Sequence, residues 1–270
     1  MVVESARVNE LEKKVLTKMV NEVHFYSRFK FINAHNGFRR GKMHVILGNP
    51  SSGKSTLTRS LMADAASNEG VKILLHLSEE TEIDYKTEIA KLGRVGDALA
   101  NVDIVSELGY YKKSQCVLTD LEKLIKENEY DIVFLDNITT SATYKEYLQQ
   151  EATQRILKQI AIDWNIALIV VAHTGKEINS STNRLINVND VRGSRSLANL
   201  AEFWYTLQNF VESENIHPTV HLEKHRGYNP GCKFYYLNYN PKYMSYTGDN
   251  ELNFEAFNEL YKSRNRLNDR

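Results

Sequence analysis

A glycine-rich loop between an apolar run and a helical pattern constrains the fold of this chain more than any other feature. It matches the pattern G-x-x-x-x-G-K-[ST], with the residues Gly48, Asn49, Pro50, Ser51, Ser52, Gly53, Lys54 and Ser55. Glycines let such a loop curl so that its backbone N–H groups face phosphate oxygens, and the following helix adds the positive end of its dipole. The alternative is a simple turn, which would not need a strand before it and a helix after it. We therefore expect Gly48 to Thr56 to bind the phosphates of ATP.

The same loop predicts a position for a divalent cation. Lys54 is expected to reach the β- and γ-phosphates, and the Ser55 hydroxyl is expected to ligate Mg²⁺. Asp136 ends the apolar run YDIVFLD, where a carboxylate suits a water-mediated contact to the same ion. The alternative for Asp136 is the cap of a turn, because Asp followed by Asn137 is common in turns.

Alternating apolar runs and helical patterns predict an α/β fold. The expected strands are short, apolar and buried, at residues 43–48, 71–77, 130–136 and 166–173. The expected helices cover residues 55–70, 115–128 and 145–164, the last with a stripe of Leu148, Ala152, Ile156 and Ile160. This order indicates right-handed crossovers and a mostly parallel sheet flanked by helices.

The two ends of the chain differ from this core. Residues 8–26 have the spacing of an amphipathic helix, which can pack on its own domain or on a neighbouring subunit. Strand patterns at 200–210, 219–225 and 232–240 predict an antiparallel C-terminal hairpin at the edge of the sheet. The expected organisation is an N-terminal helix or linker at 1–30, an ATPase core at 31–250, and a C-terminal helix with a basic tail at 251–270.

Polar residues follow the second and fourth expected strands, at the edge where parallel sheets bind ligands. Glu79 and Glu80 follow the second strand, and we expect one of them, preferably Glu79, to be the catalytic base. The alternative is a helix start with Ser78 as N-cap. His173 ends the fourth strand with Thr174, where it can sense the γ-phosphate, or be a histidine that simply bonds a backbone carbonyl.

Lys224 and Arg226 lie two residues apart at the end of a strand, and a period of two places them on one face. From spacing alone, two interpretations are equally supported. The pair is either a solvated hairpin tip, or a set of cations that reaches the γ-phosphate of an adjacent subunit.

Composition excludes some classes of protein. The net charge is +0 with a sequence pI of about 7.1, which argues against a protein that coats nucleic acid through a broad basic surface. The 2 cysteines have no metal-type spacing, and no apolar run is long enough to span a bilayer. We expect a cytoplasmic protein with no membrane partner, in the cytoplasm of a bacterial host if a phage encodes it.

Taken together, the motifs resemble the RecA-like core of hexameric replicative helicases, the DnaB family and its relatives. The similar segments span about residues 30–240 and include GNPSSGKST, HLSEET, IVFLDN, VVAHTGK, NDVRGSRSLANLAEFWYTL and EKHRGYNPGCKFYYL. His173 departs from DnaB proteins, which usually have Gln there, and looks more like RepA-type helicases. Glu79-Glu80-Thr81 is also similar to KaiC-type and recombinase-like ATPases.

The resemblance implies a ring, usually a hexamer, with ATP and Mg²⁺ at each interface. It implies that Lys224 and Arg226 act in trans, and that single-stranded DNA passes through the channel. Carried over, the DNA-binding candidates are Lys176, Arg184, Arg192, Gly193, Ser194 and Arg195. The alternative for this loop is a surface loop that is disordered without a ligand.

The predicted function is therefore an ATP-driven helicase or translocase on single-stranded DNA in DNA replication, with a loader or a primase as a possible partner. The alternative is a RecA/KaiC-like ATPase that does not unwind DNA and acts as a recombination mediator, a loader or a regulatory switch.

Overall fold

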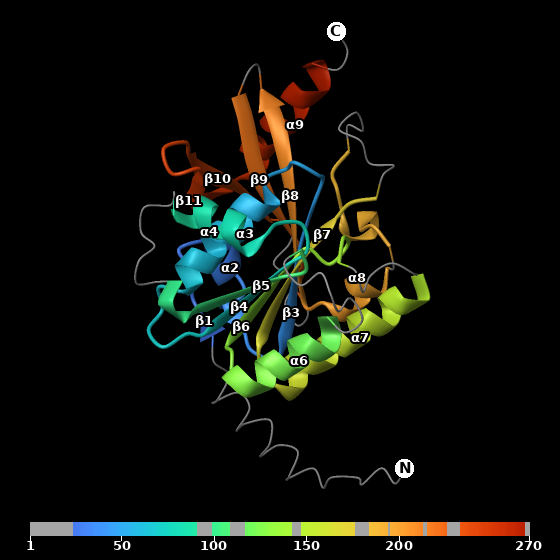
Figure 1. The fold of residues 1–270 in the computed structure, drawn as a ribbon. Coiled ribbons are helices and arrows are strands. Elements are labelled where there is room, and N and C mark those ends of the chain that lie inside the picture. Colours follow the sequence, from blue (N-terminus) through green and yellow to red (C-terminus); the bar gives the residue numbers. More distant parts are fainter. Residues whose placement is uncertain are drawn as a thin grey trace, which may run out of the picture.

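The computed structural model describes residues 24–90, 99–108, 117–141, 147–175, 184–193, 195–212, 215–225 and 233–267. In this part of the chain the centre is a 9-stranded sheet with the strand order β11-β10-β9-β8-β3-β7-β6-β4-β5 (Figure 1). A small antiparallel pair, β1 (His24–Phe25) with β2 (Phe38–Arg39), precedes it. The α/β class predicted from the sequence is confirmed.

One half of the sheet is parallel. Its strands are β3 (Lys42–Gly48), β4 (Ile73–Leu77), β5 (Val102–Ser106), β6 (Ile132–Asp136) and β7 (Ala167–His173). The four predicted apolar runs form β3, β4, β6 and β7, as expected. The register places Gly48 beside His173 and Leu77 beside Asp136, so the strand ends predicted to carry chemistry lie at one edge.

The other half is antiparallel from β8 onward. Its strands are β8 (Phe203–Glu212), β9 (Asn215–His225), β10 (Lys233–Asn240) and β11 (Ser245–Leu252). The predicted pairing of β9 with β10 is confirmed. The sequence did not predict β11, which pairs with β10 and is the edge strand, so the hairpin lies one strand further in than expected.

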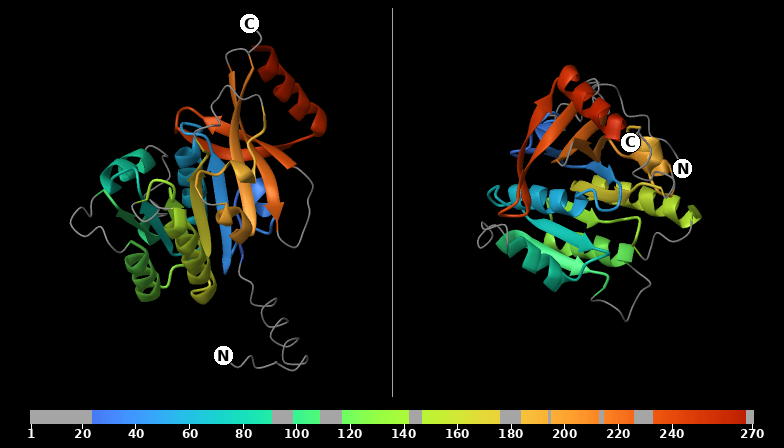
Figure 2. Two further views of the ribbon diagram at one scale, coloured as in Figure 1. Left: turned by 90° about the vertical axis from the view of Figure 1, so that its right-hand side faces the viewer. Right: turned by 90° about the horizontal axis from the view of Figure 1, so that it is seen from above.

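Helices cover both faces of the sheet. One face carries α2 (Lys30–Asn33), α3 (Lys54–Ala65) and α4 (Glu82–Ala90), and the other carries α6 (Val117–Asn128), α7 (Tyr147–Asp163) and α8 (Ser196–Leu200) (Figures 1 and 2). Short 3-10 turns are η1 (Leu99–Asn101) and η3 (Val188–Asp190), and α9 (Phe254–Leu267) packs on β8. No helix in these described ranges is long and apolar enough to cross a membrane.

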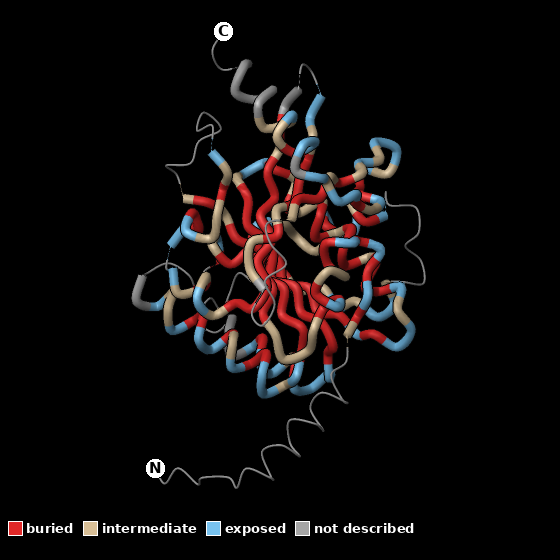
Figure 3. The backbone as a smooth tube through the Cα atoms, turned by 180° about the vertical axis from the view of Figure 1, so that it is seen from behind, coloured by how far each residue is buried: buried red, intermediate tan, exposed pale blue. Residues whose placement is uncertain are grey.

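The alternation of side chains along the strands divides the core into two clusters. Ile46 of β3 packs with Leu57 and Leu61 of α3, whereas its neighbours Val45 and Leu47 join the cluster under α6 and α7. Successive strand residues point to opposite faces, so a strand covered on both sides must be apolar throughout. Figure 3 shows the buried sheet strands between helices with exposed outer faces.

The stripe predicted for α7 is correct at Ile160 and wrong at Ala152 and Ile156. Ile160 is 3% exposed, whereas Ile156 is 45% exposed and Ala152 is also exposed. The helix buries Thr153, Gln154, Leu157, Ile160 and Ala161, at spacings that also fit a helical face. A face that contains buried Thr and Gln is hard to choose from apolar spacing alone.

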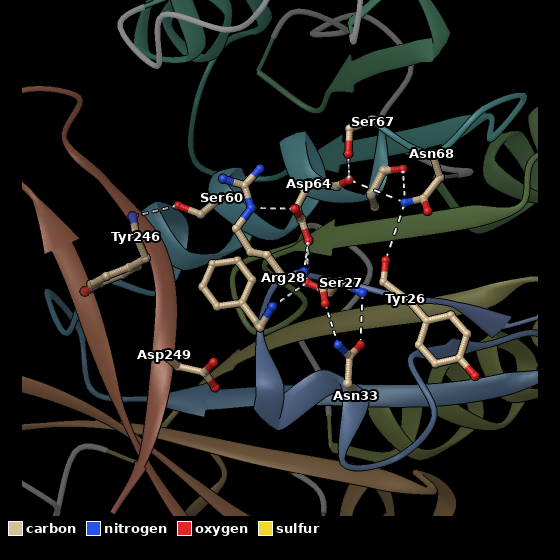
Figure 4. A network of polar contacts seen from close by, with 12 residues as sticks. Tyr26, Ser27, Arg28, Asn33, Ser60, Asp64, Ser67, Asn68, Tyr246 and Asp249 are labelled. Carbon is tan, nitrogen blue, oxygen red and sulfur yellow. Dashed lines mark hydrogen bonds and ion pairs between the residues drawn. The ribbon is translucent and has the colours of Figure 1, made fainter.

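The segment that leads into the core is held by carboxylates from two distant elements. Asp64 of α3 accepts hydrogen bonds from Ser27 Oγ at 2.5 Å and from the Arg28 backbone N–H at 2.7 Å (Figure 4). Asp249 of β11 accepts the first N–H groups of α2, those of Lys30 and Phe31, at 2.6 and 2.9 Å. Because the first turn of a helix leaves such donors without an intrahelical partner, Asp249 caps α2 from the far edge of the sheet.

The amphipathic helix expected at 8–26 falls mostly outside the described residues. Its last part is wrong, because His24 and Phe25 form β1. The helix predicted after residue 251 is confirmed as α9, where Phe257 packs against Phe210 and Phe234.

Candidate active site

The glycine-rich loop connects β3 to α3 at the carboxyl edge of the sheet. A side chain at Gly48 would place its Cβ 2.7 Å from Ser52 Oγ and 2.8 Å from the Leu207 carbonyl oxygen. At Gly53, whose φ is 93°, a Cβ would lie 2.6 Å from the Tyr246 hydroxyl. Contacts this short do not occur, and a positive φ strains other residues, so both glycines are required by the local geometry.

Within this loop, two side chains have the chemistry to bind a phosphate. Ser52 Oγ is buried and has no hydrogen-bond partner among the described residues. Lys54 Nζ donates to the Asn49 carbonyl oxygen at 2.6 Å, within the loop itself. Burial lowers the Lys54 pKa to about 8, partly offset by Asp136 and Glu79, so the side chain is still largely a cation at neutral pH. A buried hydroxyl and a cation in one loop fit an anionic ligand.

Asp136 stands at the end of β6 beside this loop. Its side chain is buried and shares a hydrogen bond with Ser55. Burial raises the Asp136 pKa to about 6, with a further contribution from Glu80, against a lowering by Lys54. A carboxylate and a hydroxyl in contact supply the hard oxygen ligands that Mg²⁺ prefers, so Ser55 and Asp136 fit the predicted ion. In the described residues, there is no group of three or more His, Cys, Asp or Glu side chains that could hold a metal.

The two glutamates after β4 have different surroundings. Glu80 accepts two hydrogen bonds of 2.7 Å from Arg59 of α3, which holds its carboxylate against that helix. The Glu79 side chain is 47% exposed, and its Oε1 lies 3.3 Å from His173 Nε2. Glu79 is therefore the member of the pair that faces the loop and His173. Its catalytic role stays a prediction.

The helix after these glutamates starts later than a cap at Ser78 would require. α4 begins at Glu82, and Thr81 Oγ1 accepts from the Asp84 backbone N–H at 3.2 Å. Ser78 instead donates to the Asn137 carbonyl oxygen at 2.8 Å and accepts from the Asn137 N–H at 3.0 Å. The N-cap alternative for Ser78 is wrong, and the residue ties the loop after β6 to the end of β4.

Asn137 is a site residue that the sequence indicated only as part of a turn. Its Oδ1 accepts from the Thr140 backbone N–H at 3.1 Å, a donor whose direction is fixed. This bond orients the amide so that Nδ2 lies 2.7 Å from His173 Nε2 and donates to it. Burial lowers the His173 pKa, and Lys54 lowers it further, which favours the neutral ring that this bond needs. The only sequence signal for this contact was the position of Asn137, directly after Asp136.

The end of β7 also joins the phosphate loop to the loop predicted to bind DNA. Thr174 Oγ1 donates to Asn49 Oδ1 at 2.6 Å, and the Thr174 backbone forms a bridge with Val191. One residue on, the Arg192 N–H donates to the His173 carbonyl oxygen at 2.9 Å. The end of β7 therefore contacts both loops through adjacent residues.

The predicted DNA-binding residues are only partly brought together. Arg192, Gly193 and Arg195 are exposed, whereas Arg184 forms two 2.6 Å hydrogen bonds with Asp190. Lys176 and Ser194 lie outside the described residues.

The predicted cation pair is described only in part, because Arg226 lies outside the described residues. Lys224 Nζ donates to the Ala198 carbonyl oxygen of its own subunit. Its action on a neighbouring subunit stays a prediction.

A protein-family model described as AAA domain matches residues 33–179, which is more than half of the chain. The chain belongs to the AAA domain family. The matched residues contain the phosphate loop, Glu79, Asp136 and His173, which are the residues that the sheet assembles at one edge.

Two further comparisons place this AAA domain among known proteins. It is 28% identical to Protein RecA from two strains of Ureaplasma parvum serovar 3 over 120 residues, which is 43% of this chain. The match spans 32% of the length of those curated relatives. In structure, the chain is similar to the solved ATPase domain of another protein, with a TM-score of 0.71 and 16% identity over 91% of this chain and 99% of that one.

These comparisons confirm the predicted RecA-like resemblance. The likeness to the solved ATPase domain establishes the fold, because it extends over nearly all of both chains at low identity. The chain is thus a RecA-like ATPase of the AAA domain family.

Proposed function

We propose that this ATPase is a ring-forming helicase or translocase that moves on single-stranded DNA and serves DNA replication. The observation that carries the proposal is the pair of contacts at the end of β7. Thr174 bonds the phosphate loop, while the backbone of residues 173–174 bonds that of residues 191–192. A change at the γ-phosphate is therefore transmitted to the candidate DNA loop through adjacent backbone groups.

ATP hydrolysis is assigned to residues at the carboxyl edge of the sheet. The N–H groups of the loop and Lys54 hold the phosphates, and Glu79 orients the attacking water and accepts its proton. Ser55 and Asp136 would hold Mg²⁺, which would supply neutralisation of the phosphate charge. Burial and Lys54 favour a neutral His173, and the bond from Asn137 fixes its ring, so that it can contact the γ-phosphate without a charge of its own.

Full activity is assigned to an interface between subunits, most simply in a hexamer. Lys224 would leave its position in the isolated subunit, and Lys224 and Arg226 together would contact the γ-phosphate of the neighbouring one. An arginine supplied in trans contributes on the order of 10³-fold or more to turnover in such enzymes. In the isolated subunit Lys224 Nζ donates to the Ala198 carbonyl oxygen, a contact that it would exchange for the phosphate.

DNA binding is assigned to the exposed cations of the loop that follows β7. Arg192 and Arg195 are exposed next to Gly193, and Lys176 and Ser194 belong to the same stretch of sequence. A few cations and backbone groups on phosphates give binding that depends on salt and not on base sequence. Several copies of one short loop around a channel concentrate charge even though the chain is neutral overall. A loader or a primase is a further partner under this proposal.

The test uses the full chain with and without oligo-dT. We expect single-stranded DNA to stimulate ATP hydrolysis, and we expect a forked duplex to lose its displaced strand only when ATP is hydrolysed. A Lys54→Ala variant is the control for contaminating activity. Absence of both stimulation and displacement would contradict the proposal.

The identity to Protein RecA favours a second candidate. A RecA/KaiC-like ATPase would use the same residues for hydrolysis and act as a recombination mediator, a loader or a switch. This candidate predicts DNA-independent turnover, or DNA stimulation without any strand displacement.

A further inference from the structure

Glu223 of β9 is a buried carboxylate that the proposed chemistry does not use. The pairing of β8 with β9 passes from Trp204 opposite Lys224 to Tyr205 opposite Leu222, so Glu223 is the extra residue of a β-bulge. Its side chain is 8% exposed. Bulges re-aim side chains next to functional sites. Here the bulge directs two consecutive residues, Glu223 and Lys224, to the segment between residues 188 and 198.

The Glu223 carboxylate joins the sheet to the start of η3. One oxygen accepts from Thr206 Oγ1 of β8 at 2.5 Å, and the other accepts from the Val188 backbone N–H at 2.8 Å. Val188 is the first residue of η3, and the N–H groups at such a position have no partner within the turn. A buried carboxylate is costly unless it is hydrogen-bonded. Glu223 therefore needs these donors, and the Val188 N–H needs this acceptor.

A second contact from the sheet lies two residues earlier. Gln208 of β8 accepts from the Ile186 N–H at 3.1 Å and donates to the Arg184 carbonyl oxygen at 3.2 Å. The titratable groups around Glu223 are His221, whose Nδ1 lies 3.6 Å away and whose pKa burial lowers to about 4, and Asp190, which is paired with Arg184. Residues 184–190 of the candidate DNA loop are therefore fixed to β8 and β9.

The next residues of the same loop, 190–192, are fixed to the end of β7. Gly175 N–H donates to the Asp190 carbonyl oxygen at 2.9 Å, in addition to the bonds of residues 191 and 192 described above. Residues 184–192 thus form a bridge between two strands. β7 ends at the protein's own phosphate loop, and β9 leads into the cation pair assigned to the neighbour's phosphate.

We propose that Glu223 is a positioning residue that couples the DNA loop to β9, the strand that carries Lys224 and precedes Arg226 in the sequence. DNA that binds the loop then shifts the cation pair through one carboxylate. The coupling rests on the proposed function, whereas the attachment of Val188 to Glu223 is a property of the fold that can be measured separately.

The experiment compares three variants at pH 8. Glu223→Leu removes both acceptors at similar volume, and Glu223→Gln keeps an acceptor oxygen for Val188. Leu222→Ala is the matched control. Leu222 is a buried neighbour on β9 that packs in the core, so its substitution should lower stability while leaving the contacts of Glu223 with the loop in place. Two quantities are measured: amide hydrogen exchange of residues 184–190, and the ratio of DNA-stimulated to basal ATP hydrolysis.

We expect Glu223→Leu to speed exchange at residues 184–190 by roughly tenfold or more, because a hydrogen bond to a charged acceptor shifts a local opening equilibrium by that order. The DNA-stimulation ratio should fall by a similar factor. Glu223→Gln should stay within about threefold of the wild type in both quantities, since it keeps one charge-free acceptor. Leu222→Ala should leave the ratio and the local pattern of exchange unchanged.

The proposal is overturned if amide exchange at residues 184–190 in Glu223→Leu is the same as in the wild type, or if that exchange speeds up but the DNA-stimulation ratio does not fall. It is also overturned if Glu223→Gln or Leu222→Ala behaves like Glu223→Leu. If Glu223→Leu does not fold, amide hydrogen exchange in the wild-type protein tests whether the loop is attached to Glu223. The Val188 and Ile186 amides should then be as protected as those of β8, and fast exchange overturns the attachment. If wild-type hydrolysis does not respond to DNA, the proposed function fails while the exchange result still stands.

Discussion

Exchanging Glu79 and Glu80 for glutamine, one at a time, separates a catalytic carboxylate from a structural one. Glu79 is 47% exposed and faces His173, so Glu79→Gln changes no ion pair with a lysine or arginine that the structure describes. Loss of a general base costs on the order of 10²–10⁴ in turnover, or about 3–5 kcal/mol of transition-state stabilisation. Binding of ATP should be kept, because Lys54 and the loop are untouched.

Glu80→Gln should have the opposite profile. Its carboxylate takes two 2.7 Å bonds from Arg59, and a carboxamide oxygen keeps one of them. The lost charge-assisted bond is discounted because the Glu80 side chain is 33% exposed, which leaves a cost of about 1 kcal/mol. For a chain of this length, that is a fall in melting temperature of about 2 °C, with turnover within a few fold.

The assay is single-turnover phosphate release, with binding of a fluorescent ATP analogue and thermal unfolding measured on the same preparations. If Glu79→Gln keeps more than about a tenth of wild-type turnover, the size of effect expected of a base is missing and the assignment fails. A large loss in Glu80→Gln without loss of stability would instead identify Glu80 as the base.

Three further predictions concern stability, assembly and pH. Asp64→Asn should lower the free energy of unfolding by about 3 kcal/mol and the melting temperature by about 5 °C. The reason is that the carboxylate is buried and accepts three short hydrogen bonds from residues 27 and 28. An unchanged melting temperature would contradict this prediction. Arg226→Ala should lower hydrolysis by roughly 10³-fold, and mixing it with Lys54→Ala subunits should restore part of the activity, whereas no complementation would exclude action between subunits. Burial raises the Glu223 pKa to about 7, so its contribution to stability is present below the unfolded value near 4.5 and is lost as pH rises through about 7. Glu223→Gln should therefore gain about 2–3 kcal/mol relative to wild type between pH 5 and pH 8 in denaturant titrations, and a pH-independent difference would show that the raised pKa is wrong.

The central strands and the phosphate loop were predictable because local and tertiary preferences agree there. Residues 43–48 are apolar throughout, apart from His44, as a strand with two covered faces requires, and Gly48 and Gly53 occupy positions that exclude a side chain. Asp136 and His173 followed from the rule that parallel strands present ligands at their carboxyl ends.

Other elements carry too weak a local signal. β11 contains Gly248, Asp249 and Asn250, which are poor strand formers, and it exists because β10 offers a partner and because Asp249 caps α2. β5 is an edge strand with mostly half-exposed residues, so it lacks the apolar run that identifies its neighbours.

The contacts within the site were even harder to predict from the sequence. Arg59 holds Glu80 across two elements, and Asn137 is oriented by Thr140, pairings that depend on how α3 and the loop after β6 meet. Glu223 reaches Val188 because of a bulge, and a bulge depends on a register between strands that spacing along the chain does not reveal.

The sheet separates the two apolar clusters, and this division has a consequence for how the molecule tolerates change. Leu61 belongs to the side that supports the helix of the phosphate loop, and Leu157 belongs to the side that supports α8 beneath the candidate DNA loop. Losses from substitutions that share no partners add independently. Substitutions that repack one side of the sheet can therefore change the affinity for nucleotide or for DNA separately, because the layer on the opposite side is left unaltered.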